Sequence, residues 1–219
     1  MRGHAMRMAV QNLVIGGSMA TMLSACGLLG IGDPDEIEGL RKIAVLPVAY
    51  SDGAGGGYPC DICPGTIQLK PTTAQAARLA TGFLYEEVAR HPRILKPGFE
   101  LVEPAAKKGM RQGAAELAAA GQADAVLATA LVELRPRVGS DHGPDTPAGA
   151  VMYAALVDAR TGAVLWSSTF DGNESGPGVV RKRINRLTGA KVARWRTAEG
   201  YTEAATRELV EGLMDHLDG

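Results

Sequence analysis

Apolar residues along this chain fall into two kinds of pattern. Some segments are apolar almost without interruption, which is typical of strands that are covered on both faces of a sheet. Others mix apolar and polar residues in shorter runs that still end at turn signals such as Gly162. Five strands are predicted in this way, over residues 42–50, 99–102, 123–134, 150–158 and 164–170. The last two are joined by so few residues that they should form a hairpin.

A second pattern, with apolar residues on one helical face, predicts three helices. Thr72 or Thr73 can cap the first, which should end near His91. Pro104 can open the second, and Gly121 should end it after Ala120. The third is expected over residues 197–217. The residues expected on the buried faces of the first and third helices are Ala76, Leu79, Ala80, Phe83, Leu84, Val88, Tyr201, Ala205, Leu209, Val210, Leu213 and Leu217.

The order of these elements is β-α-β-α-β-β-β-α, which predicts an α/β (α+β) fold. Crossover helices favour parallel pairing of the first strands, whereas the last three strands should form an antiparallel meander. We therefore expect a mixed sheet of about five strands with helices packed on it. The segments 51–71, 138–147 and 171–196 are rich in glycine, proline or charge, and they are predicted to be loops.

The amino terminus has the features of an export signal. Arg2 and Arg7 precede an uncharged, largely apolar run over residues 8–22, and the small residues Ser24 and Ala25 stand before Cys26. This segment resembles a bacterial lipoprotein signal. The resemblance implies that the Cys26 sulfur receives a diacylglyceryl group, that the preceding peptide is removed, and that the new amino terminus is acylated, with palmitate as a typical acyl chain. An ordinary secretory signal or a short buried helix is the alternative.

These signals divide the chain into three parts: a cleaved signal peptide (1–25), a tether rich in glycine and acids (26–41) and one domain (42–219). Removal of the signal leaves 194 of 219 residues and changes the net charge from −1 to −3, because two arginines and no acids are lost. A nearly neutral domain of this size can bury a core, and it is not expected to bind nucleic acid.

Three segments resemble a periplasmic α/β superfamily that includes the CsgG-type, LpoB-type and TolB amino-terminal domains. They are residues 43–47 (IAVLP), 121–127 (GQADAVL) and 156–166 (LVDARTGAVLW). The resemblance covers about residues 42–170. It implies a non-catalytic accessory or binding factor in cell-envelope assembly or secretion, with an envelope protein as partner. By resemblance to lipoprotein sorting, Gly27 after the lipidated cysteine favours the periplasmic face of the outer membrane over the inner membrane.

Cys60 and Cys63 form the sharpest candidate for chemistry. In an oxidising compartment an even pair of cysteines predicts a disulfide. A metal site and a thiol-redox site remain as alternatives. However, Pro64 replaces the histidine that haem attachment requires, and the chain's histidines show no paired spacing for zinc.

Two other patterns are weaker. Ser140, Asp141 and His142 are the residue types of a hydrolase triad, but three consecutive loop residues do not easily converge, and a solvated turn is expected. The glycines of residues 53–57 lack the Gly-Lys-Ser/Thr end of a phosphate loop. We therefore expect no catalytic residue, no cofactor, no metal and no enzyme activity. The alternative is a periplasmic redox or hydrolytic enzyme that uses the Cys60–Cys63 loop.

The segment 181–196 is strongly basic and contains no acid. It is a candidate patch for a protein partner or an anionic surface, with a solvated basic loop as the alternative. Its candidate residues are Arg181, Lys182, Arg183, Arg186, Lys191, Arg194, Trp195 and Arg196. The sequence thus predicts a protein attached to a membrane by its N-terminal lipid that binds an envelope protein. An oligomeric secretion component is a further alternative.

Overall fold

A computed structural model describes residues 40–92, 94–95, 97–140, 144–172, 181–184 and 191–218. The predicted signal peptide and most of the tether, including Cys26, lie outside these residues, as do Asp141, His142 and Arg186. In the part of the chain that is described, no helix combines the length and the apolar character needed to cross a bilayer.

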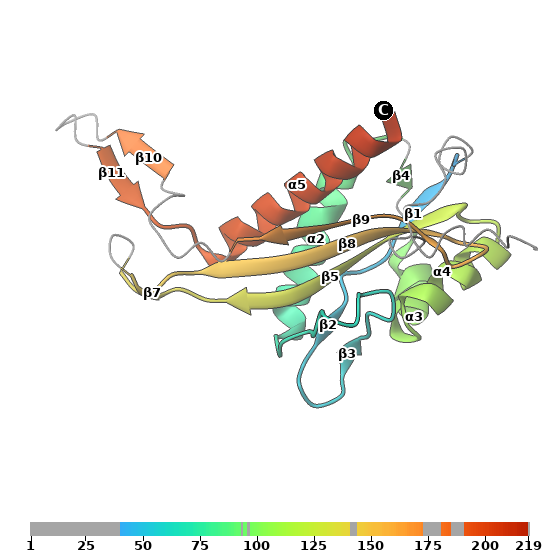
Figure 1. Cartoon of the computed structure of the whole chain (residues 1–219), viewed down its shortest axis with the longest axis horizontal. Coiled ribbons are helices and arrows are strands. Elements are labelled where there is room, and N and C mark those ends of the chain that lie inside the picture. Colours follow the sequence, from blue (N-terminus) through green and yellow to red (C-terminus); the bar gives the residue numbers. More distant parts are fainter. Residues whose placement is uncertain are drawn as a thin grey trace, which may run out of the picture.

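The centre of the molecule is a mixed sheet of five strands in the order β4-β1-β5-β8-β9 (Figure 1). β1 pairs in parallel with β4 and β5, whereas β5, β8 and β9 form an antiparallel meander. The bounds are Ile43–Val45 for β1, Ile94–Leu95 for β4, Ala125–Arg135 for β5, Gly149–Asp158 for β8 and Val164–Asp171 for β9. The predicted fold class, parallel start and antiparallel meander are confirmed.

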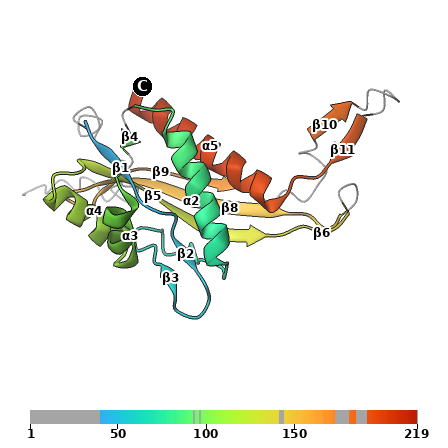
Figure 2. The same ribbon diagram turned by 180° about the vertical axis from the view of Figure 1, so that it is seen from behind.

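Helices cover both faces of this sheet, as Figures 1 and 2 show from opposite sides. α2 (Ala74–Val88) and α5 (Ala198–Asp218) pack on one face, where they share a buried cluster with Val45 and Leu127. α3 (Phe99–Lys107) and α4 (Met110–Ala119) pack on the other, around Ala44. The alternation of Ala44 and Val45 between the two clusters follows from the period of two along a strand.

The first and last helices agree closely with expectation. Thr73 caps α2 by accepting a hydrogen bond from the Ala76 backbone N–H at 3.1 Å. One residue of its predicted buried face is wrong, since Leu79 is 40% exposed. In α5, the predicted residues Tyr201, Ala205, Leu209, Val210 and Leu213 are all buried, and Leu217 is partly buried.

The predicted strand over 99–102 is wrong. These residues form the first turn of α3. Leu101 is exposed there, and Val102 is buried in the core cluster between the sheet and the helices α3 and α4. The pairing position beside β1 is taken by β4, a few residues earlier. The predicted helix over 104–120 is in fact two helices, because Gly109 between them adopts a φ of 109° that a helix does not allow.

Each of the three segments predicted to be loops contributes to a small hairpin, and the first hairpin also includes Tyr50, the last residue of the predicted strand 42–50. β2 (Tyr50–Ser51) pairs with β3 (Gly57–Tyr58), β6 (Val138–Gly139) pairs with β7 (Pro144–Thr146), and β10 (Arg181–Ile184) pairs with β11 (Lys191–Arg194). In both ribbon views the last two hairpins lie at the same end of the molecule. These strands are two to four residues long, too short for an apolar period to appear in the sequence.

Candidate functional site

The long segment 51–71 is packed against the domain. Cys60 and Cys63 are joined by a disulfide with 5.5 Å between their Cα atoms. Between them, Ile62 is 6% exposed and belongs to the same buried cluster as α3 and α4, and both cysteines pack against that cluster. The Lys70 backbone N–H donates to the Val132 carbonyl at 2.8 Å, which fixes the end of the segment to β5.

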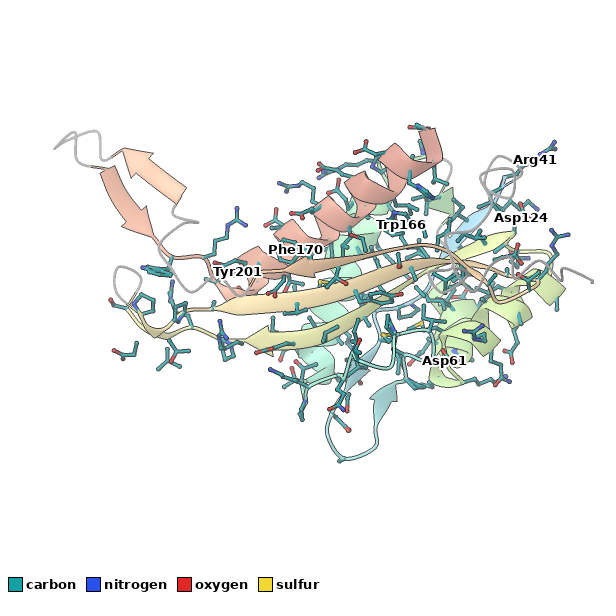
Figure 3. The ribbon with its side chains drawn as sticks, in the orientation of Figure 1. Arg41, Asp61, Asp124, Trp166, Phe170 and Tyr201 are labelled. Atoms are coloured by element: carbon teal, nitrogen blue, oxygen red, sulfur yellow. A yellow bond between two sulfur atoms is a disulfide. The ribbon has the colours of Figure 1, made fainter. Side chains whose placement is uncertain are left out.

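Asp61, inside the disulfide loop, also caps α4. Its carboxylate accepts a hydrogen bond from the Arg111 backbone N–H at 3.0 Å, across 50 residues of sequence. The first N–H groups of a helix lack partners within the helix, so this contact satisfies one of them. Figure 3 shows Asp61 beside these helices. The disulfide loop therefore connects the segment 51–71 to the helical layer, which is a structural role.

The thiol and metal alternatives have little support in this surrounding. No group of three or more His, Cys, Asp or Glu side chains among the described residues could hold a metal ion. Both sulfurs are in the disulfide, and the intervening Ile62 and Asp61 are engaged in packing and capping. The metal and redox roles therefore stay predictions. No contact among the described residues favours either role.

A pocket of about 390 Å³ lies between the β2–β3 hairpin, α2 and α3, and we call it the tyrosine pocket. Three of the chain's five tyrosines line it. The remaining lining residues are small, apolar or charged: Pro47, Val48, Gly57, Ala74, Ala77, Arg78, Thr81, Gly82, Glu103 and Lys107. The tight hairpin brings two of the tyrosines together, because Gly57 adopts a φ of 104° and pairs with Ser51.

The three tyrosines of the pocket are Tyr50, Tyr58 and Tyr85. The rings of Tyr50 and Tyr58 meet edge to face with centroids 5.6 Å apart. The Tyr58 hydroxyl donates to Glu103 Oε1 at 3.1 Å, and the Tyr85 hydroxyl donates to the Val45 carbonyl at 3.4 Å. Burial raises the pKa of Tyr85 to about 12, and burial together with the hydrogen bond to Glu103 raises the pKa of Tyr58 to about 12.

Charged groups stand on the α2 and α3 sides of the tyrosine pocket. Lys107 forms an ion pair with Glu103 at 3.2 Å. The pKa of Glu103 is lowered, first by the hydrogen bond from Lys107 and then by the one from Tyr58. Arg78 is exposed, and its guanidinium makes no hydrogen bond or ion pair with any part of the chain that the structure describes. The pocket therefore carries two cations and one carboxylate.

A second candidate region is the end of the molecule that carries the β6–β7 and β10–β11 hairpins, and we call it the basic end. Arg137 Nη1 donates to the Trp195 carbonyl at 3.1 Å, which connects the end of β5 to the residue after β11. The Arg196 guanidinium lies 5.7 Å from the centroid of the Tyr201 ring, at the start of α5. Figure 3 shows Tyr201 next to Phe170 of β9.

The structure brings most of the predicted basic patch onto one hairpin. Arg181 is opposite Arg194 in the pairing of β10 with β11, and Ile184 is opposite Lys191. Arg135 and Arg137, which the sequence analysis did not include, belong to the same end, and their Arg135-x-Arg137 spacing was the available signal.

The tyrosine pocket was also missed at the level of sequence. It is assembled from a hairpin, a helix and a second helix, and its charged groups Arg78 and Glu103 are 25 residues apart. The only signal was the placing of Tyr50 and Tyr58 on either side of the glycine-rich loop. Of the weak hydrolase pattern, only Ser140 is among the described residues, and Asp141 and His142 lie outside them, so the expected solvated turn stays a prediction.

The sequence matches no established protein family and no curated protein. Solved structures with a similar arrangement include the PelC dodecamer from Paraburkholderia phytofirmans, at 17% identity and a TM-score of 0.44, covering 79% of this chain and 86% of that one. The LpoB C-terminal domain from Salmonella enterica is similar at 15% identity and a TM-score of 0.37, covering 61% and 83%. Lipoprotein GNA1162 from Neisseria meningitidis is similar at 18% identity and 0.38, covering 63% and 88%.

An LpoB-type domain, one of the resemblances drawn from the sequence, is therefore among these structures. The CsgG-type and TolB resemblances stay predictions. All of these similarities are distant, and function has to be argued from the residues of this chain.

Proposed function

We propose that this protein is a lipid-anchored, non-catalytic binding factor of the bacterial cell envelope, accessory to assembly or secretion. The observation that carries the proposal is the order of positive charge, apolar run and small residues before Cys26, followed by a tether and a domain. One acyl chain alone binds a membrane only marginally, whereas a diacylglyceryl group with an added acyl chain anchors a protein stably.

The disulfide supports a location outside the cytoplasm. Disulfides persist in the bacterial periplasm and are rare in the reducing cytosol. The pair Cys60 and Cys63 is packed in the domain rather than placed at a strand-to-helix junction, where redox-active cysteines are usually found. Gly27, in place of aspartate after Cys26, supports the periplasmic face of the outer membrane within this proposal.

The basic end is the proposed surface for a protein partner or an anionic polymer or lipid. In both views the β10–β11 hairpin, which carries five of these basic residues, projects away from the main sheet. Trp195 adds an indole, which combines an apolar body with one hydrogen-bond donor and suits an interface. Positive charge of this density attracts acidic surfaces and speeds their association.

The pairing of β1 with β5 supports a large distance between the tether and the basic end. Leu40 lies at the end of the tether, three residues before Ile43, and Ile43 pairs with Ala125 at the start of β5. Arg135 is the last residue of β5, ten residues after Ala125, and lies at the opposite end of that strand. At about 3.3 Å per residue these positions are roughly 33 Å apart. A domain held at Leu40 can therefore direct its basic end away from the lipid head groups.

A charge-reversal experiment tests the binding role. We expect Arg181→Glu with Arg183→Glu to reduce the crosslinked partner captured in intact cells, while thermal unfolding stays unchanged. The matched control is Arg41→Glu with Arg160→Glu, which reverses the same amount of charge on exposed residues away from this end. Equal recovery of crosslinked product from the two variants would overturn the assignment of the basic end.

The oligomeric alternative is tested by mass measurement of the full chain in detergent. A large ring would favour the oligomeric secretion component, and a monomer or small oligomer would favour the simple binding factor. This experiment is independent of the charge reversal, because assembly and partner capture are measured separately.

A further inference from the structure

The tyrosine pocket shares no lining residue with the basic end. Its volume of about 390 Å³ is near the lower end of the range for ligand pockets, about 300–1,000 Å³. A site of this size accommodates one or two amino-acid residues rather than a long segment. We propose that it binds the C-terminal end of a protein, with the terminal carboxylate at Arg78 and an apolar last side chain among the three tyrosine rings.

The lining of the pocket favours an apolar group inside it. The hydroxyls of Tyr58 and Tyr85 already have partners, so these two rings offer mainly carbon surface to a ligand. Ala74, which is exposed at the start of α2, adds apolar surface, whereas Val48 and Ala77 are buried beneath the pocket. Thr81 adds no free polar group, because its Oγ1 accepts from the Val48 backbone N–H at 3.0 Å and donates to the Ala77 carbonyl at 2.8 Å.

This scarcity of free polar groups argues against a carbohydrate. A sugar carries a hydroxyl on most of its carbons, and each hydroxyl taken from water without a partner lowers affinity. Apart from the two cations and Glu103 Oε2, only the Tyr50 hydroxyl among the lining side-chain groups lacks a hydrogen bond or ion pair within the described residues. An apolar side chain with one charged group next to it fits the lining better.

The charges specify the sign of the ligand. Lys107 and the Tyr58 hydroxyl both contact Glu103 Oε1, and the two cations of the pocket outnumber its one carboxylate, so the net charge of the lining favours an anionic ligand. Arg78 has no partner in the described chain, although it is close enough to Tyr58 and Glu103 to influence both electrostatically. A guanidinium can form two parallel hydrogen bonds with a carboxylate. A peptide C-terminus supplies that carboxylate directly beside a side chain.

The test uses the full chain in detergent and two matched probes, N-acetyl-Ala-Ala-Phe as the free acid and as the C-terminal amide, measured by calorimetric titration. We expect the acid to bind at least about tenfold more tightly than the amide, because a charge-assisted hydrogen bond contributes at least one factor of ten. Arg78→Gln should remove this preference. Arg160→Gln, which removes an exposed cation in the β8–β9 turn, should retain it.

A second variant tests the pocket itself. Gly82 lines the pocket, and a Cβ added there meets no atom within 4 Å, so Gly82→Leu can fill the space without disturbing α2. We expect this variant to fold normally, as judged by circular dichroism, and to lose binding of the acid. The proposal is overturned if neither probe binds the wild-type chain, if acid and amide bind equally, or if Gly82→Leu binds as the wild type does.

Discussion

Replacement of both disulfide cysteines, Cys60→Ser with Cys63→Ser, is expected to lower the free energy of unfolding by about 2 kcal/mol. The estimate follows from the loop that the bond closes, since the two cysteines are separated by three positions and the closed loop contains four residues. In the chain-entropy model a loop of four residues restricts the unfolded chain by about 6 cal/mol/K, or about 2 kcal/mol at 25 °C.

Packing sets an upper limit to this loss. Ile62 stays buried and Asp61 stays at the start of α4 if the loop keeps its place without the bond. If the loop detaches instead, the cap is lost as well, which adds about 1 kcal/mol, and Ile62 is exposed, which adds about 1.5–3 kcal/mol. The expected loss is therefore about 2 kcal/mol if the loop keeps its place and up to about 6 kcal/mol if it detaches.

Urea unfolding of the full chain, followed by circular dichroism, measures this difference directly. Wild-type protein in reductant should unfold at the same urea concentration as the double variant, which provides the control. Alkylation of the reduced protein should be no faster than alkylation of a small free thiol at the same pH. No change in stability, together with much faster alkylation than that of the free thiol, would refute the structural reading and favour the thiol-redox alternative.

Three further predictions concern the cap, the core and the pocket. Asp61→Ala should destabilise the protein by about 1 kcal/mol and speed hydrogen exchange at the first turn of α4, and unchanged exchange there would contradict the cap. Leu213→Ala, at a fully buried site, should cost about 2–5 kcal/mol, whereas Leu101→Ala, at a site 51% exposed, should cost far less; similar losses would contradict the core assignment. Stability should fall as the pH rises from 10 towards 12, because tyrosines of the unfolded chain ionise near 10.0 while Tyr58 and Tyr85 hold their protons to about 12. An ultraviolet titration in which all tyrosines ionise near pH 10 would contradict this last prediction.

The central sheet could be predicted from the sequence because its strands are long and buried. β5 and β8 contain 11 and 10 residues, and their apolar runs leave little choice between strand and loop. The hairpin between β8 and β9 was also predictable, since Asp158 and Gly162 are typical turn residues. Asp158 accepts hydrogen bonds from the backbone N–H groups of Arg160 and Thr161, at 2.9 and 2.6 Å.

The segment 94–109 was not predictable in the same way. Its helix α3 begins without a side-chain cap at Gly98 and contains Pro104, which normally opens a helix or breaks one. The local signals therefore favoured a strand followed by a later helix start. Tertiary packing decides the outcome, because Val102 and Ala105 are buried against the sheet only when the turn before Pro104 is helical.

The tyrosine pocket shows why sites formed by several segments escape sequence reasoning. Tyr50 and Tyr58 are close in sequence, but Tyr85 and Glu103 come from two separate helices. No spacing rule connects them. By contrast, the basic segment was visible as a charge pattern, although its division into β10 and β11 was not.

The membrane anchor is the central claim, and the mass of the native mature protein tests it most directly. Extraction from bacterial membranes and mass spectrometry of the N-terminal peptide should give a chain that begins at Cys26 and carries a diacylglyceryl group and an acyl group. The same peptide from a Cys26→Ala variant should lack both groups. A native product that begins at Met1, or a Cys26 without lipid, would contradict the account.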